Sequence, residues 1–427
     1  MKKFSQITSL MTGVLLMSLF SGCTSVQMAP ANARSNHFDT VSSHLDLGGE
    51  VYMYTDIEGD IDKVAAFADK ALKQSGELPE DISDKIDMKK IVSSLGLSQV
   101  MAVGLSSFKK NNRYINKSFV SVEGKKKGLL TIAGDEPHKF ELPEFAPNGV
   151  SIAFEEDINL KTFFEMMIEI IKDVPGSEEF DELMTKLNEP IAPGLFSTMD
   201  IIEKADTKIM IAVKMDKEKM ITIPDEDFRV PYTDAVISID NMGFIVPKLI
   251  EMVKDSGLFS IKEFDKYQSI HLVQEFPGDM SSYSPIMQRD KDTNRIYIAT
   301  TPAFLSKCLG TDNKLSGDKS YQVAVADLPV NEGNALSYIS PEFSGFVSSI
   351  LKEALHNEKK LKFVSALIDE QLKDSNIPQA SVLKVEKNGI YTASSSAYSH
   401  KLTFLALGYF NPVTLGILAA ISIPSLF

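Results

Sequence analysis

One run of acidic residues has a spacing that could bind a cation. The acids occupy alternate positions: Asp56, Glu58, Asp60 and Asp62. A calcium loop of the EF-hand type places oxygen ligands in this way, but it also needs Gly at its sixth position and Glu at its twelfth. Counted from Asp56, those positions hold Ile61 and Phe67. Acids are also favoured at the start of a helix, so we expect a helix that begins near Asp60, and we predict no metal site.

Spacings typical of catalytic sites are sparse. Ser-x-x-Lys, which activates the serine of penicillin-binding enzymes, begins at Ser106, Ser349 and Ser381, but neither Ser-Asp-Asn nor Lys-Thr-Gly accompanies it. The six histidines form no His-x-x-x-His pair. No Gly-x-Ser-x-Gly turn, P-loop or dinucleotide-binding fingerprint is present. The sequence therefore predicts no catalytic residue and no cofactor.

Charge and cysteine content exclude two classes of protein. The formal net charge is −14 over 427 residues, whereas a nucleic-acid partner would require a basic surface. Two cysteines, Cys23 and Cys308, are too few for a disulfide scaffold. Cys308 lies in an apolar stretch and is expected to be a buried thiol.

The N-terminus reads as an export signal. Residues 1–22 combine Lys2 and Lys3 with a charge-free run that is too short to span a bilayer. The ending Leu19-Phe20-Ser21-Gly22-Cys23 resembles the lipobox of bacterial lipoproteins, where cleavage before the cysteine is coupled to its acylation. The resemblance implies a lipid-modified Cys23 that anchors the protein in the cell envelope, facing the periplasm or the cell exterior. Residues 23–47 are rich in Ser, Ala, Asn and Thr, which predicts a flexible tether.

A strand followed by an amphipathic helix occurs twice. Val150, Ile152 and Phe154 alternate as in a strand, and the apolar residues of 160–171 recur at the helical period. The same pattern begins at 333 and continues to 354, displaced by 183 positions. Three further pairs agree with this spacing to within three residues: Val51 with Val236, Leu142 with Leu328, and Glu203 with Glu386.

These spacings predict a tandem duplication. Half 1 would span 48–215, a polar linker 216–232, and half 2 residues 233–401. A hairpin is expected in half 1, with strands 118–122 and 129–132 around the turn 123–128. Strands that follow one another and are interrupted by single helices favour an α+β fold: each half a mostly antiparallel sheet with helices packed on one face.

The final segment, 402–427, carries no charged residue. Its part Thr414-Leu415-Gly416-Ile417-Leu418-Ala419-Ala420-Ile421-Ser422-Ile423-Pro424 resembles the hydrophobic N-terminal helix of type IV pilins and type II secretion pseudopilins. The family's cleavage site and its glutamate are absent, so the resemblance does not imply prepilin processing. It implies a membrane or partner segment that includes Leu415, Ile417, Leu418 and Ile421. The alternative is an apolar segment docked on the body, because Pro412 interrupts a spanning helix.

The sequence as a whole favours a non-catalytic, lipid-anchored bacterial envelope protein with a binding or scaffolding role. Its partners would be the membrane and an envelope protein. One alternative is an envelope hydrolase, which two carboxylates with raised pKa values between the halves would favour. Another is an accessory component of a type II secretion or type IV pilus-like assembly. The ligand, the oligomeric state and the choice of membrane stay open.

Overall fold

The computed structural model describes residues 35–75, 86–172, 177–192, 194–204, 206–222, 229–346 and 376–400. Cys23, the signal peptide and the segment 402–427 lie outside the described residues, as does most of the helix expected over 343–354.

A single antiparallel sheet connects almost the whole described chain. Its thirteen strands are β1 (Val51–Asp56), β2 (Val100–Lys110), β3 (Arg113–Val122), β4 (Ile152–Asn159), β5 (Asp206–Thr222), β6 (Arg229–Ile239), β7 (Phe259–Glu263), β8 (Tyr267–Leu272), β9 (Ile286–Asp290), β10 (Ile296–Ala299), β11 (Ala335–Ile339), β12 (Gln379–Glu386) and β13 (Gly389–Ser396). Across the sheet they follow the order β1-β2-β3-β13-β12-β11-β4-β5-β6-β10-β9-β8-β7. Strands from both predicted halves therefore share one sheet.

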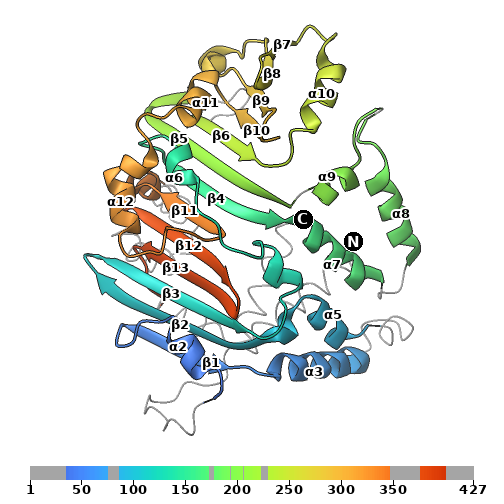
Figure 1. The fold of residues 1–427 in the computed structure, drawn as a ribbon, viewed down its shortest axis with the longest axis vertical. Helices are drawn as coiled ribbons and strands as arrows, with labels where there is room; N and C mark the ends of the chain where they lie inside the picture. Colours follow the sequence, from blue (N-terminus) through green and yellow to red (C-terminus); the bar gives the residue numbers. More distant parts are fainter. Residues whose placement is uncertain are drawn as a thin grey trace, which may run out of the picture.

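Helices accompany this sheet, so the mixed α+β class is confirmed. They are α2 (Phe38–Ser42), α3 (Asp60–Ser75), α5 (Met88–Ser94), α6 (Leu142–Phe145), α7 (Leu160–Lys172), α8 (Ser177–Asn188), α9 (Thr198–Lys204), α10 (Ile245–Val253), α11 (Pro302–Leu309) and α12 (Lys319–Val325). Figure 1 shows α6, α11 and α12 together on the left of the sheet, with α3, α5, α7, α8 and α9 towards the right. The helices expected from near Asp60 and over 160–171 correspond to α3 and α7.

Helices pack on both faces of the sheet, which differs from the predicted arrangement. Successive residues of a strand point to opposite faces. In β10, Ile296 packs in a cluster with α10, whereas the next residue, Tyr297, packs in a cluster with α11. We call the face that carries Tyr297 the first face and the other the second face.

The sheet order has a centre. Outward from the neighbouring strands β4 and β11, it reads β5, β6, β10, β9, β8, β7 on one side and β12, β13, β3, β2, β1 on the other, so the two sides match except for β7 at the edge. Phe154 of β4 lies directly opposite Ser337 of β11, and these two residues are separated by the 183 positions found in the sequence.

The prediction of a hairpin with strands 118–122 and 129–132 is wrong. The hairpin of this region joins β2 to β3 through Asn111 and Asn112, whose φ angles are 50° and 64°, as a type I′ turn requires. Residues Gly128–Thr131 form a 3-10 helix instead of a strand. The second edge of β3 is taken by β13, more than 250 residues away, and local sequence does not reveal such a partner.

Two segments expected to be irregular contribute to the fold. The predicted tether 23–47 contains α2, and Val41 and Leu45 are buried against Phe119. Gly104 permits this approach, because a Cβ there would lie 2.3 Å from Cγ1 of Val41. The predicted linker 216–232 contains the end of β5 and the start of β6.

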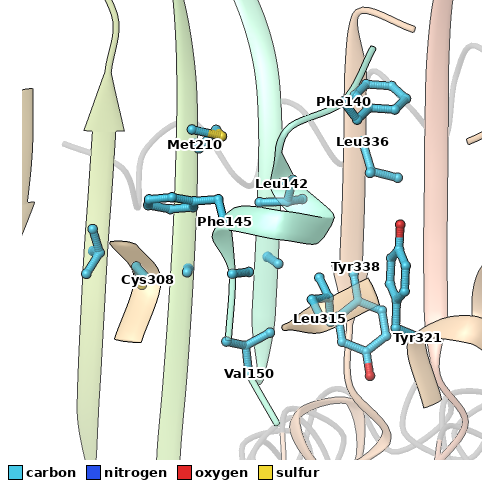
Figure 2. Close-up of a cluster of buried hydrophobic side chains, with 14 of the residues drawn as sticks. Phe140, Leu142, Phe145, Val150, Met210, Cys308, Leu315, Tyr321, Leu336 and Tyr338 are labelled. Carbon is cyan, nitrogen blue, oxygen red and sulfur yellow. The ribbon is translucent and has the colours of Figure 1, made fainter. Parts of the chain in front are cut away.

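The largest buried cluster lies between the first face and helices α6, α11 and α12. Figure 2 shows Leu142 and Phe145 of α6 beside the central strands, with Leu315, Tyr321 and Tyr338 gathered next to them. Burial of an aliphatic or aromatic side chain contributes about 1.5–3 kcal/mol, so this cluster holds the helices on the sheet. Among the described residues, no helix is long and apolar enough to cross a bilayer.

Replacing Leu336 tests this core. Leu336 of β11 is 0% exposed, so Leu336→Ala should lower the free energy of unfolding by about 2–5 kcal/mol through lost burial and a residual cavity. Urea denaturation measures the change. Val323→Ala, at a residue 52% exposed on α12, is the control, and an equal loss in both variants would contradict the assigned core.

Candidate functional site: a charge cluster on the central strands

Five charged side chains meet on the first face, where strand register and flanking turns bring them together. They are Glu141, Glu155, Lys208, Asp240 and Arg295, and we call them the charge cluster. Glu155 lies on β4 and Lys208 on β5, while Asp240 directly follows β6 and Arg295 directly precedes β10. Glu141 stands just before α6. The cluster therefore joins four neighbouring strands and the helix that covers them.

Arg295 is the main cation of the cluster. Its Nε and Nη2 donate to both carboxylate oxygens of Asp240, with Nη2 2.9 Å from Oδ2, and its Nη1 lies 2.9 Å from Oε2 of Glu141. This two-pronged contact with Asp240 matches the fixed geometry of a guanidinium. Burial alone would lower the pKa of Arg295, but its bonds to Asp240 and Glu141 raise that pKa overall. The guanidinium stays charged at any pH at which the fold exists.

Lys208 is the second cation. Its Nζ donates to Oε1 of Glu141 and lies 3.9 Å from Oδ2 of Asp240 and 4.0 Å from Oε1 of Glu155. Burial raises the pKa of Glu141, but hydrogen bonds from Arg295 and Lys208 outweigh it and lower the pKa to about 2. Glu141 is therefore a carboxylate at neutral pH.

Glu155 is the one acid of the cluster that is 0% exposed. Its Oε2 accepts hydrogen bonds from the backbone amides of Glu141 and Leu142, at 2.9 and 2.6 Å. Its Oε1 is buried and accepts no hydrogen bond. Burial raises the pKa of Glu155 although the amide of Leu142 and the charges of Lys208 and His138 act in the opposite direction. The carboxyl holds the start of α6 on β4.

His138 lies beside the cluster as a bridge between acceptors. Nε2 is 2.9 Å from Oδ1 of Asp157, and Nδ1 is 3.0 Å from the carbonyl oxygen of Lys139. Both ring nitrogens therefore face oxygens that only accept, which favours the imidazolium with two N–H donors. The hydrogen bond to Asp157 raises the pKa of His138, against the effect of burial.

Asn334 connects this histidine to the strand pair at the centre of the sheet. Its side chain, 0% exposed, donates to the carbonyl oxygen of Glu136 and to Oδ2 of Asp157, and accepts from the amide of Val385. His138 and Gly333 exchange both backbone hydrogen bonds at 2.9 Å. Residues before β4, on β4, before β11 and on β12 are thus joined by one network.

The acidic and basic side chains of the charge cluster neutralise one another. Glu141 and Asp240 are bonded to fixed cations, Glu155 is out of contact with solvent, and both ring nitrogens of His138 face acceptor oxygens. The pKa of Glu156 is also raised by burial, but Glu156 neighbours Glu155 on the strand and points to the second face. Glu155 and Glu156, the two carboxylates with raised pKa values in the described part of the chain, therefore do not converge.

The residues singled out from the sequence lie elsewhere and apart. Asp62 accepts a hydrogen bond from Ser98, and Asp60 pairs with Lys63. The described residues include no group of three or more His, Cys, Asp or Glu side chains that could hold a metal ion. Ser106 and Ser381 lie on strands, where a residue three positions on points to the opposite face. Ser349 lies outside the described residues.

The expected burial of Cys308 is confirmed. The thiol is 2% exposed, and burial raises its pKa to about 12. A neutral buried thiol is a poor nucleophile, so Cys308 is part of the core.

Sequence reasoning missed the charge cluster. Its members are spread from 141 to 295, and only strand register brings them together. The available signal was Glu155-Glu156-Asp157, three consecutive acids in a strand that begins with Ile152. Acids in such a strand need cationic partners when buried.

A double-mutant cycle tests the pair at the centre of the cluster. Because Arg295→Gln removes the hydrogen-bonded cation of Asp240 and leaves Glu141 with Lys208 alone, it should lower the free energy of unfolding by about 3 kcal/mol. Combined with Asp240→Asn, it should give a coupling energy of about 1–3 kcal/mol in urea denaturation. The exposed pair Asp60 and Lys63 serves as control and should show no coupling. Additive effects at Arg295 and Asp240 would disprove the pairing.

The cluster also predicts acid sensitivity. The folded pKa of Glu141, about 2, lies below its ordinary value of 4.5, so its stabilising contribution is complete above the ordinary value and is lost as pH falls towards 2. Glu141→Gln should lower the urea midpoint at about pH 6 and have less effect at about pH 3. A deficit that is constant between these two pH values would contradict the assignment.

Comparison of the chain with family models, with curated proteins and with solved structures gave no match. The function is therefore argued from the sequence and from the geometry above.

Proposed function

We propose that this protein is an exported, lipid-anchored protein of the bacterial cell envelope with a non-catalytic binding or scaffolding role. The lipobox-like sequence around Cys23 supports the anchor. Fourteen residues separate Cys23 from the start of α2 at Phe38. Fully extended, they would span at most about 50 Å, which suits a folded body held near a membrane surface.

The observation that carries the non-catalytic role is the state of the charge cluster. It is a dense group of titratable side chains on the first face, and each ion in it has a fixed counter-ion or is shielded from solvent. A catalytic acid or base must instead reach its substrate and exchange a proton with it. Mutual neutralisation supports a structural role for these charges.

A hydrolase is the second candidate, and one feature favours it. His138 retains 30% exposure of its side chain and lies between Asp157 and Glu155, with Nδ1 3.7 Å from Oε1 of Glu155. Against it, both ring nitrogens of His138 are used as donors. We therefore rank it below the binding role.

We also propose that the chain contains two repeats of one unit, β1 to β6 and β8 to β13, so that the boundary falls after β6 (Arg229–Ile239) and not in the linker 216–232. The sheet order supports this, because β1 to β6 and β8 to β13 occupy equivalent positions about the β4 and β11 pair. In this correspondence β4 matches β11, as the 183-residue spacing predicts. The strand that matches β1 by position is β8, whereas the sequence comparison had matched β1 to β6. Each unit would lend its first three strands to the sheet of the other, so the halves would fold together.

Fractionation of cells tests the anchor. Wild-type protein should sediment with membranes and incorporate labelled palmitate, whereas Cys23→Ala should do neither, because each buried methylene of an acyl chain contributes about 0.8 kcal/mol. Cys308→Ala is the matched control and should keep the label. Palmitate incorporation in the Cys23→Ala protein would disprove lipidation at this residue. If that variant stays at the membrane without label, a second attachment exists and the acyl chain is not the sole anchor.

A further inference from the structure

One row of directly opposed residues crosses the second face from edge to edge. Directly opposed residues on neighbouring strands share a face. From β1 to β7, in sheet order, the row reads Val51, Ser107, Asn116, Ser394, Ser381, Ser337, Phe154, Ile211, Ile237, Ile298, Met287, Ile270 and Ile261. It includes no charged residue.

The row changes character at the centre of the sheet. On the β11 side, the polar side chains bond to one another: Oγ of Ser107 donates to Oδ1 of Asn116 at 2.6 Å, and Oγ of Ser337 and Ser381 are 2.7 Å apart. On the β4 side every member is apolar. Towards the β7 edge, Met287 and Ile270 pack in the cluster that includes α10.

Between these two regions lies an apolar patch, made of Ile152, Phe154, Ile211, Val213, Ile237 and Ile298. Within the described part of the chain, none of the six belongs to a buried cluster or packs against one. Ile298 is 37% exposed, and the others are half-buried. Contiguous apolar side chains left at this exposure indicate a surface that another segment covers.

The described chain ends on this same face. After β13, the amide of His400 donates to Oδ1 of Asn116, and Oγ of Ser399 lies 2.8 Å from Oγ of Ser107. The side chain of Asn116 also donates to the carbonyl oxygen of Tyr398. Asn116 and Ser107 belong to the row, so the chain arrives at residue 400 over the second face, at β2 and β3.

We propose that the uncharged segment 402–427 packs on the second face and covers the apolar patch. Five strand spacings of about 4.8 Å separate β3 from β5, or about 24 Å. The segment has 26 residues, which reach about 39 Å even as a helix. Its residues Leu415, Ile417, Leu418 and Ile421 supply apolar surface without bringing charge to an uncharged row. The proposal does not depend on the lipid anchor.

Thiol labelling tests the cover in the otherwise complete chain carrying Cys23→Ala. Ile211→Cys places a reporter in the patch, and Val323→Cys places a control on the exposed surface of α12. A maleimide should react with the Ile211→Cys thiol on the order of ten-fold more slowly in the full chain than in a chain ending at Lys401, because labelling then requires local opening. The Val323→Cys thiol should react equally in both. Cys308, 2% exposed, reports any unfolding by becoming reactive.

A second variant controls for the possibility that truncation itself disturbs the fold. Leu415→Asp, Leu418→Asp and Ile421→Asp together should raise the labelling rate of Ile211→Cys as truncation does, with Cys308 still unreactive. Equal slow rates with and without the segment would overturn the proposal and show that something else covers the patch. Equal fast rates would also overturn it and leave a membrane or a partner as the site of the segment. Protection that appears only at high protein concentration would indicate a second copy.

Discussion

The fold depends on the pairing of β4 with β11. These strands come from chain positions nearly two hundred residues apart, and every other strand is added outward from them. The charge cluster and the His138 network both involve β4, and through Asn334 they reach β11 and β12. Breaking this pair would expose Glu155, Asn334 and the largest buried cluster together. The sheet is therefore expected to unfold as one cooperative unit, although its sequence suggests two halves.

Local sequence predicts the elements well where one residue period dominates. The helix predicted over 160–171 matches α7 because its apolar pattern is regular. The hairpin at 118–132 was wrong, because β3 pairs with the distant β13 and leaves 128–131 free to form a 3-10 helix. The alternation of Ile152 and Phe154 predicts a strand but misleads about its buried side. Ala153 and Glu155 are the fully buried residues of β4, since the close approach of α6 favours a small side chain and a hydrogen-bond acceptor.

The charge cluster could not be predicted from the sequence, for a related reason. Glu141, Lys208, Asp240 and Arg295 are unremarkable acids and bases in their local sequences, and strand register alone makes them partners. The same register places the polar members of the row on the β11 side of the second face and the apolar members on the β4 side. The two faces thus have different roles. The first face carries the largest buried cluster and the charge cluster, which stabilise the sheet, and the second face is proposed to bind the hydrophobic segment 402–427. The acyl anchor proposed at Cys23 would hold this body in the envelope.

Native-state hydrogen exchange tests most directly the claim that one sheet unites the two halves. The account predicts that amides of β4 and β11 exchange most slowly, and that their opening free energy equals that of global unfolding in urea. It also predicts that Arg295→Gln lowers the opening free energy of these amides and the free energy of global unfolding by the same amount. If β11 to β13 instead open at a lower free energy than β4 to β6, the two sides of the sheet unfold separately and the account is contradicted.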